Sequence, residues 1–123
     1  MQTLAIAGGG AVGALLRFWM SNGVYALLGR SFPYGTLAVN LTGSLLMGIL
    51  YVLLLEKLAL GPMARAALLV GLLGAFTTFS TFTMETINLV EAGEMMRAVL
   101  NVALSVALCI GATWVGVLAG RTL

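Results

Sequence analysis

The stretch that decides the fold is residues 98–120, which read AVLNVALSVALCIGATWVGVLAG, 23 residues without a charged side chain. About 20 consecutive, mostly apolar residues let a helix cross the hydrocarbon core of a bilayer, which is about 30 Å thick. Two more uncharged windows, 31–55 and 66–84, hold 25 and 19 residues, and the segment 1–29 is interrupted by Arg17 alone. We therefore predict an all-α membrane protein with four transmembrane helices, near 3–28, 35–55, 65–84 and 98–119.

The composition of the whole chain supports this prediction. Of the 123 residues, 61% are apolar and 8% are charged. Soluble domains carry about 25% charged residues, so the six basic and four acidic residues of this chain could not cover a water-facing surface. The predicted connections are short, and we expect residues 1–123 to form a single four-helix transmembrane domain surrounded by the lipid bilayer.

Several classes of function lack the residues that they need. The chain has one cysteine, Cys109, and no histidine, which excludes an intramolecular disulfide, paired-cysteine zinc sites and the commonest general base. The six basic residues are scattered rather than clustered, so we expect no nucleic-acid partner. The four glutamates fall at the ends of the predicted spans or between them, where no proton relay is expected. Passive conduction is favoured over pumping, and we do not expect an enzyme.

Basic residues are almost evenly divided between the two predicted membrane faces. Lys57, Arg65 and Arg121 fall on the side of the N-terminus, and Arg30 and Arg97 fall on the other side. Because the bias of lysine and arginine in short loops sets orientation, three against two permits insertion both ways round. Four helices are few to enclose an aqueous path, so we predict a two-fold homodimer, and dual topology allows that dimer to be antiparallel.

The third predicted span is the least lipid-like. After Gly74, residues 77–83 read TTFSTFT, with five hydroxyl side chains in seven positions. Serine and threonine can bond back to the i−4 carbonyl and weaken a helix, so we predict that this helix is broken near its centre. Freed carbonyls at a break could bind a cation or line a pathway. Alternatively, the hydroxyl groups form a seam between packed helices.

Three phenylalanines also recur in this span. Phe76, Phe79 and Phe82 are spaced by three, so on a continuous helix they share one side. Such a stripe is typical of core packing. Because aromatic rings have positive edges, rings turned edge-on beside hydroxyl donors could instead hold a small anion.

Polar residues recur every four positions on the second and fourth predicted spans. On the second span they are Thr36, Asn40 and Ser44. On the fourth span they are Asn101, Ser105, Cys109 and Thr113. This spacing places each set along one helix face, and polar groups at membrane depth need hydrogen-bond partners. Each set predicts either pore-lining donors or hydrogen bonds between helices.

The first span contains a glycine pattern and a charge. Gly9-x-x-x-Gly13, like Gly116-x-x-x-Gly120 in the fourth span, is a pattern of close helix approach. Arg17 is the only charge clearly inside a predicted span, where it costs about 2.5–3.5 kcal/mol on insertion scales. Its side chain either anchors the helix by reaching the interface, or places a positive charge in a vestibule that attracts anions.

Taken together, these stretches resemble the small bacterial fluoride channels of the Fluc or CrcB family. The resemblance is carried by GALLR at 13–17, GTLAVNLTGS at 35–44, GLLGAFTTFSTF at 71–82 and the following Glu85, and it extends over essentially the whole chain. It implies a fluoride-selective ion channel that exports cytoplasmic fluoride passively. It also implies a multi-pass protein of the bacterial inner membrane, assembled as an antiparallel, dual-topology homodimer with two pores.

The resemblance also implies roles for individual residues of a pore lined by phenylalanine ring edges and by asparagine, serine and threonine donors. Phe79 and Phe82 match the phenylalanines that coordinate fluoride, and Asn40 matches the pore amide. The other donors that it implies are Thr36, Ser80, Ser105 and Thr113. Cys109 stands at a position that is often a hydroxyl, which leaves its role open.

A structural sodium ion and a vestibule charge follow from the same resemblance. Gly74 and Thr77 match the residues whose backbone carbonyls hold a central sodium ion, and Arg17 matches the vestibule arginine. The main alternative is a dual-topology small multidrug antiporter, but such a carrier needs an acid within the membrane, and the first span offers Arg17 instead. A third possibility is a non-conducting assembly subunit. It would explain the glycine patterns of close helix approach, but it would not explain the polar residues that recur every four positions on the second and fourth spans.

Overall fold

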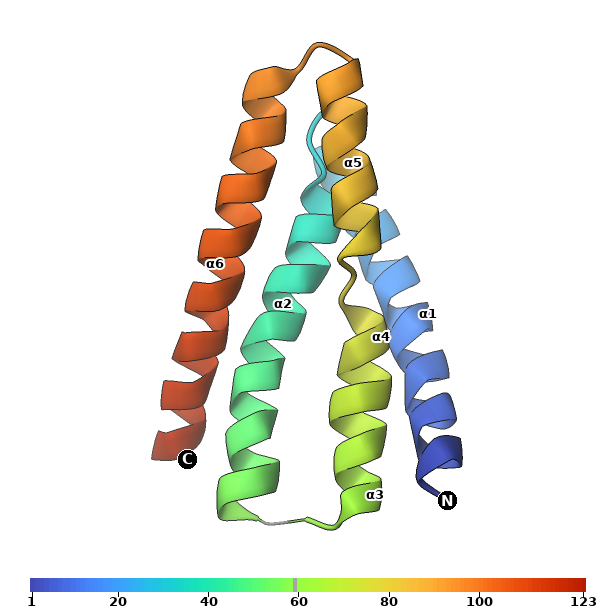
Figure 1. The fold of residues 1–123 in the computed structure, drawn as a ribbon, viewed down its shortest axis with the longest axis vertical. Helices are drawn as coiled ribbons and strands as arrows, with labels where there is room; N and C mark the ends of the chain where they lie inside the picture. Colours follow the sequence, from blue (N-terminus) through green and yellow to red (C-terminus); the bar gives the residue numbers. More distant parts are fainter. Residues whose placement is uncertain (59) are drawn as a thin grey trace.

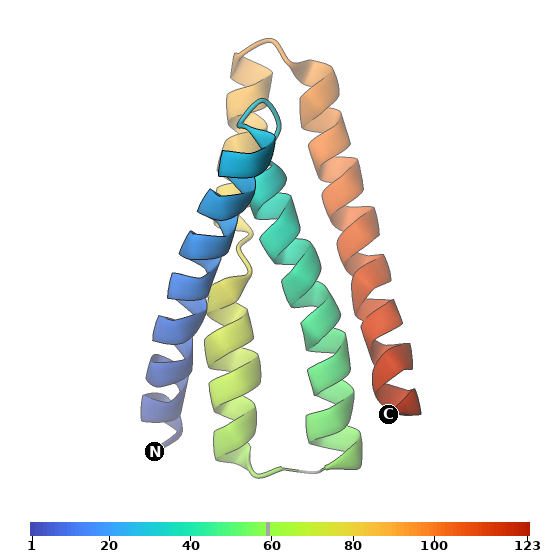
Figure 2. The same cartoon turned by 180° about the vertical axis from the view of Figure 1, so that it is seen from behind.

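The computed structural model describes residues 1–58 and 60–123, which form a bundle of long helices (Figures 1 and 2). Four segments are long and apolar enough to cross a membrane, which confirms the prediction of an all-α fold with four spans. The first is α1 (Gln2–Leu28), and the last is α6 (Met95–Thr122). The second consists of α2 (Tyr34–Tyr51) and the π-helical η1 (Val52–Lys57). The third consists of α3 (Pro62–Arg65), the π-helical η2 (Ala66–Leu73), α4 (Gly74–Phe76) and α5 (Ser80–Glu91).

The third segment is not one continuous helix. α4 ends at Phe76 and α5 begins at Ser80, and Figure 1 shows the chain passing between them as a short coil. Thr77 has an extended backbone, with φ −84° and ψ 157°. The segment Thr77–Phe79 therefore leaves helical geometry inside a stretch of membrane length.

The third segment is also longer than the sequence predicts. The predicted span ends at residue 84, before the first charge, whereas α5 continues to Glu91. Glu85 therefore lies inside a helix and not in a connection. The prediction was wrong here because it treated a carboxyl group as the end of a span, and the structure gives Glu85 a hydrogen-bond donor, the Tyr25 hydroxyl of α1.

Glycines bring two pairs of segments into backbone contact. A Cβ atom added to Gly13 of α1 would overlap the carbonyl oxygen of Leu72 in η2. A Cβ atom added to Gly116 of α6 would likewise overlap the Leu45 carbonyl of α2. The two close-approach patterns of the sequence are thus confirmed, and they pack α1 against η2 and α6 against α2.

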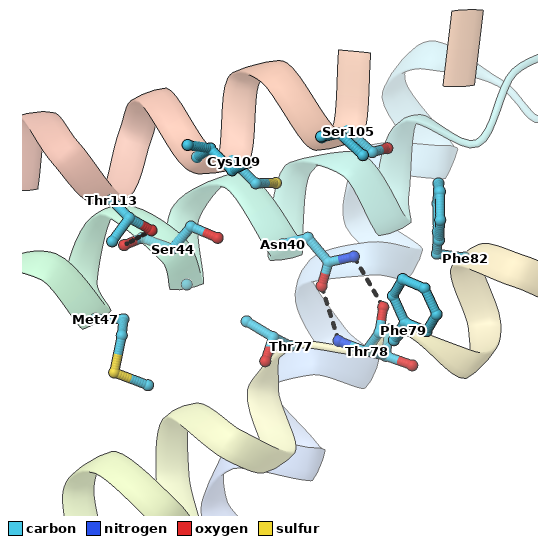
Figure 3. Close-up of a pocket in the computed structure, with 13 residues that line it drawn as sticks. Asn40, Ser44, Met47, Thr77, Thr78, Phe79, Phe82, Ser105, Cys109 and Thr113 are labelled. Carbon is cyan, nitrogen blue, oxygen red and sulfur yellow. Dashed lines mark hydrogen bonds between the residues drawn. The ribbon is translucent and has the colours of Figure 1, made fainter. Parts of the chain in front are cut away.

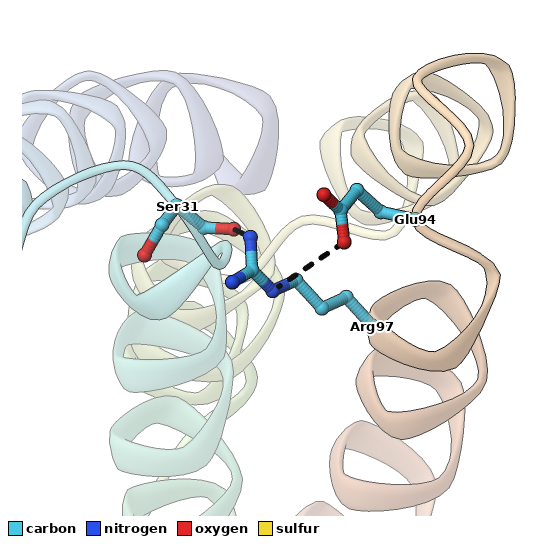
Figure 4. Close-up of polar contacts among 3 residues, drawn as sticks. All are labelled: Ser31, Glu94 and Arg97. Carbon is cyan, nitrogen blue, oxygen red and sulfur yellow. Dashed lines mark hydrogen bonds and ion pairs between the residues drawn. The ribbon is translucent and has the colours of Figure 1, made fainter.

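Polar contacts hold the connections at both ends of the bundle. At one end, Arg97 Nη1 donates to the Ser31 carbonyl at 3.3 Å, and Arg97 Nε lies 3.7 Å from the Glu94 carboxylate (Figure 4). At the other end, where both termini lie (Figure 1), Lys57 Nζ donates to the Arg121 carbonyl at 2.8 Å. A cation beside the last carbonyls of α6 is favourable because the helix dipole is negative there.

The outward surface is apolar. Large side chains on α1 and α6 are exposed, among them Trp19 at 60% and Trp114 at 68%. The fully buried positions lie between the segments and include Val39, Val52 and Leu73. This distribution suits a bundle whose solvent is lipid.

Candidate functional site

A groove of about 380 Å³ runs between α2, α6 and the Thr77–Phe79 segment (Figure 3). We call it the central groove. Its walls are formed by Asn40, Gly43, Ser44, Met47, Thr77, Thr78, Phe79, Phe82, Ser105, Val106, Cys109, Ile110 and Thr113. Of the pore residues predicted from the sequence, it brings together Asn40, Phe79, Phe82, Ser105 and Thr113. Thr36, Ser80, Gly74 and Arg17 are not among the residues that line it.

Asn40 binds the interrupted segment through both ends of its amide. Its Oδ1 accepts the Thr78 N–H at 2.7 Å, and its Nδ2 donates to the Thr78 carbonyl at 2.9 Å (Figure 3). Thr78 lies between α4 and α5, so the two backbone groups that no helix satisfies are paired by one side chain. The Asn40 amide nitrogen keeps a second N–H, and the residue lines the central groove. Both interpretations of Asn40, a hydrogen bond between segments and a groove donor, describe parts of its geometry.

The three phenylalanines do not form one stripe. Phe76 ends α4 and is 6% exposed, whereas Phe79 precedes α5 and is 75% exposed. The shared side predicted from their spacing was wrong because the helix is interrupted between them. Phe79 and Phe82 do form a pair, with ring centroids 5.4 Å apart and planes tilted by 47°. Both rings reach the central groove, where their edges are an electrostatically positive surface.

The four polar residues predicted along one face of α6 do not all lie in the same environment. Ser105, Cys109 and Thr113 line the central groove, and Thr113 Oγ1 donates to the Ser44 carbonyl at 3.0 Å. Asn101 lies behind it, 1% exposed, and its Nδ2 donates to Thr86 Oγ1 of α5 at 2.9 Å. The hydrogen-bonding interpretation therefore describes Asn101, and both interpretations describe Thr113 and Ser105, whose hydroxyl donates to Asn101 Oδ1 at 3.4 Å.

Cys109 is a free, half-buried thiol on the wall of the groove. It lies between Ser105 and Thr113 along the same face of α6 (Figure 3). An S–H group is a weaker donor than a hydroxyl. Cys109 therefore presents a polarisable sulfur atom to the groove and contributes little hydrogen bonding.

Thr36 belongs to a different cluster. It is 4% exposed, and its hydroxyl lies 3.4 Å from the Tyr25 hydroxyl, which donates to Glu85 Oε2 at 2.5 Å. A Cβ atom on Gly35 would overlap the Tyr25 ring, so glycine is needed for this contact. Neither Tyr25 nor Glu85 was predicted in this role from the sequence. The tyrosine inside an apolar span could have predicted such a contact, because the hydroxyl of a buried tyrosine needs a hydrogen-bond partner.

Arg17 makes a contact that neither sequence interpretation includes. Its Nε donates to the Ala75 carbonyl at 3.0 Å, and the residue is half-buried. Ala75 lies in α4, next to its last residue. The guanidinium group is therefore held against the end of that helix, at the start of the interruption.

The remaining predicted positions lie at or beside the interruption. The Thr77 hydroxyl donates to the Leu73 carbonyl at 3.0 Å, so it is used within its own segment. Among the hydrogen bonds of residues 1–58 and 60–123, none is accepted by the carbonyl of Gly74 or of Thr77. Ser80 is exposed at the start of α5 and accepts a hydrogen bond from the Thr83 hydroxyl at its carbonyl. The roles of these residues in transport stay predictions.

Comparison with known proteins identifies the family. The description "CrcB-like protein, Camphor Resistance (CrcB)" matches residues 4–117. A protein of Methylococcus capsulatus is 56% identical over 123 residues, and the chain spans 54% of that relative's length. A protein of Coxiella burnetii is 53% identical over 124 residues and is covered over its whole length, and one of Geobacter sulfurreducens is 51% identical over 120 residues, with 98% of this chain and 97% of the relative covered. Each of these relatives carries the name fluoride-specific ion channel FluC. The chain, a multi-pass membrane protein, therefore belongs to the CrcB-like family.

Proposed function

We propose that this protein is a fluoride channel through which cytoplasmic fluoride leaves the cell passively. The observation that carries the proposal is the central groove, whose lining residues are all uncharged and include an amide, several hydroxyls and a phenylalanine pair. The names of relatives up to 56% identical support the same conclusion. No step of this function requires a catalytic residue.

The chemistry of the groove suits fluoride. The ion is small and strongly hydrated, so a path has to replace its water with closely placed donors. The second amide N–H of Asn40 and the ring edges of Phe79 and Phe82 supply them. The Ser105 hydroxyl donates to Asn101 Oδ1 at 3.4 Å, so it would have to turn its proton toward the groove to contribute. Because none of these groups carries a full charge, the ion binds weakly enough to leave again. A negative-inside potential drives a monovalent anion outward by about 2.3 kcal/mol per 100 mV.

We propose further that two copies assemble as an antiparallel homodimer, inserted both ways in the bacterial inner membrane. Phe79, which lines the groove, is 75% exposed in one copy. Non-helical backbone at membrane depth has to be covered by protein or line water, and a second copy would provide that cover. Basic residues at both ends of the bundle, such as Arg97 and Lys57, suit either orientation.

A structural sodium ion fits the donor set at the interruption. The Gly74 and Thr77 carbonyls accept no hydrogen bond within the described residues, and unwound backbone carbonyls are suitable ligands for sodium in membrane proteins. These two carbonyls would hold the ion, which would supply a fixed positive charge there. The Thr77 hydroxyl donates its proton to the Leu73 carbonyl, and the proposed ligands are the two carbonyls rather than this hydroxyl.

The antiporter alternative finds no support. The relatives are named as channels. Glu85 does lie within the third segment, but it is absent from the residues that line the groove and its carboxyl group is bonded to Tyr25. A carrier that exchanges protons needs an acid on its substrate path, and Glu85 lines a separate pocket beside Tyr25 and Arg30.

Fluoride efflux from liposomes tests the proposal. Vesicles loaded with potassium fluoride and treated with a potassium ionophore should release fluoride only when they contain the protein. Phe82→Ile should reduce this efflux at least about tenfold, because the ring edge is lost while apolar volume is largely kept. Phe18→Ile is the matched control, since Phe18 is 59% exposed on the outer face of α1, and it should conduct normally. A folded, dimeric wild-type protein that releases no fluoride would disprove the channel.

A further inference from the structure

One face of α1 follows the third segment from its start to the interruption. Gly9 packs against the backbone of Ala67, and Gly13, one turn later, packs against that of Leu72. Arg17 comes after the next turn and therefore shares this face. The two glycine contacts bring α1 so close to η2 that the side chain of Arg17 is delivered to the end of α4.

The group that Arg17 reaches is a carbonyl without a helical partner. In a continuous helix the Ala75 carbonyl would accept the N–H of Phe79, but α4 ends at Phe76 and the chain leaves the helix. Carbonyls at a helix end need other donors. Arg17 Nε supplies one at 3.0 Å, and its positive charge lies at the favourable, C-terminal end of the helical segment.

The backbone groups around the interruption are satisfied selectively. The Leu73 carbonyl accepts the N–H and hydroxyl of Thr77, and the Thr78 carbonyl accepts the Asn40 amide. Ala75 is satisfied by Arg17. Each donor fixes the direction of one carbonyl, and together they hold the chain in the extended conformation that begins at Thr77.

We propose that Arg17 is a positioning residue of the fluoride pathway: its Nε caps α4 and thereby keeps the Thr77–Phe79 segment extended, with Phe79 on the wall of the central groove. This role rests on the function proposed above. It assigns the effect of Arg17 to one hydrogen bond rather than to the attraction of anions by its charge.

The two explanations can be separated with substitutions of matched length. The amide nitrogen of glutamine is as many bonds from Cα as Arg Nε, so Arg17→Gln keeps a donor at that point and removes the charge. Arg17→Met keeps the length and apolar stem and removes both. Arg17→Lys keeps the charge and places its nitrogen one bond further out.

Hydrogen–deuterium exchange of residues 77–81 in the purified dimer is the first measurement, because it needs no fluoride. The Thr78 and Thr81 amides are bonded to the Asn40 side chain and the Thr78 hydroxyl, so they report on the interruption. Arg17→Met should speed their exchange about tenfold, as expected for loss of a hydrogen bond to a charged donor. Arg17→Gln should stay within about threefold of wild type. Equal exchange in the wild type, the glutamine variant and the methionine variant would overturn the proposal.

Fluoride efflux is the second measurement. Efflux should fall in Arg17→Met and be largely kept in Arg17→Gln, at both low and high ionic strength. If the charge is what matters, Arg17→Lys will conduct, Arg17→Gln will not, and the differences will shrink in high salt because screening removes attraction at a distance. That pattern would overturn the proposal, and so would a lysine variant that folds when the glutamine variant does not.

Arg97→Met is the control, because Arg97 also donates to a backbone carbonyl but is exposed in the first turn of α6, at the end of the bundle. It should change neither exchange at residues 77–81 nor efflux. If the wild-type protein carries no fluoride but Arg17→Met still speeds exchange, the capping role of Arg17 is supported and the proposed channel function is wrong. If efflux is normal and exchange is unaffected by Arg17→Met, the channel stands and the cap is wrong.

Discussion

The packing of α1 against η2 can be tested by adding a single methyl group to Gly13. The Cβ atom of Gly13→Ala would lie 2.9 Å from the Leu72 carbonyl carbon and 3.1 Å from its Cα, and it would overlap the carbonyl oxygen. These are backbone atoms, so no side chain can rotate away and the two segments have to separate. Overpacking of this kind costs about 1–3 kcal/mol.

Gly23→Ala in the same helix provides the reference, because a Cβ atom there meets nothing within 4 Å. Both variants gain the same helix propensity, about 0.5–1 kcal/mol relative to glycine. The gain cancels when the two are compared. Gly13→Ala should therefore be less stable than Gly23→Ala by about 1–3 kcal/mol, and Gly23→Ala should be at least as stable as wild type.

The free energy of unfolding can be measured by titrating the protein in mild detergent micelles with a denaturing detergent. The chain's two tryptophans supply the fluorescence signal. Coincident unfolding curves for Gly13→Ala and Gly23→Ala would refute the close approach of α1 and η2. The delivery of Arg17 to the end of α4, which depends on that approach, would then need another explanation.

Three further predictions concern the hydrogen bonds of Asn40 and Tyr25 and the proposed sodium ligands. Asn40→Ala removes both hydrogen bonds to Thr78 and should lower the free energy of unfolding by about 2–6 kcal/mol, because each of the two backbone groups left unsatisfied costs about 1–3 kcal/mol. Unfolding in a denaturing detergent measures this loss, and a change below about 1 kcal/mol would contradict the two bonds. Tyr25→Phe removes the donor to Glu85 Oε2, and Oε1 has no hydrogen-bond partner among residues 1–58 and 60–123, so the free energy of unfolding should fall by about 1–3 kcal/mol. An unchanged unfolding midpoint would show that the carboxyl group finds another donor. Thr77→Ala should leave any sodium dependence of dimer stability unchanged, because the proposed ligands are carbonyls, and loss of that dependence would indicate ligation by the hydroxyl.

The helices were predictable where the relevant property is local. The uncharged window at 98–120 corresponds to α6 (Met95–Thr122) because hydropathy and length alone decide whether a helix suits a membrane. The close approach at Gly13 was also predictable, since small residues one turn apart identify a contact face. Neither inference needs knowledge of the partner segment.

The site was only partly predictable because its partners lie far away in the chain. The spacing of Asn40 shows that it needs a hydrogen-bond partner, but nothing in the sequence identifies the Thr78 backbone, 38 residues away. Glu85 was misplaced for the same reason, since its partner Tyr25 is 60 residues away. Phe76 and Phe79 were assigned to one side because helical spacing has no meaning across an interruption.

The way α5 is attached has a mechanical consequence. Glycine contacts join α1 to η2 and α2 to α6 through backbone atoms. Unlike side chains, backbone atoms cannot change rotamer to accommodate a shift of one helix against the other. α5 is held instead by flexible side chains, at Glu85 by Tyr25 and at Thr86 by Asn101. The bundle therefore contains two rigidly packed pairs, α1 with η2 and α2 with α6, and one less rigidly held helix, α5. Thermal motion is expected to be largest in α5, the helix that carries Phe82.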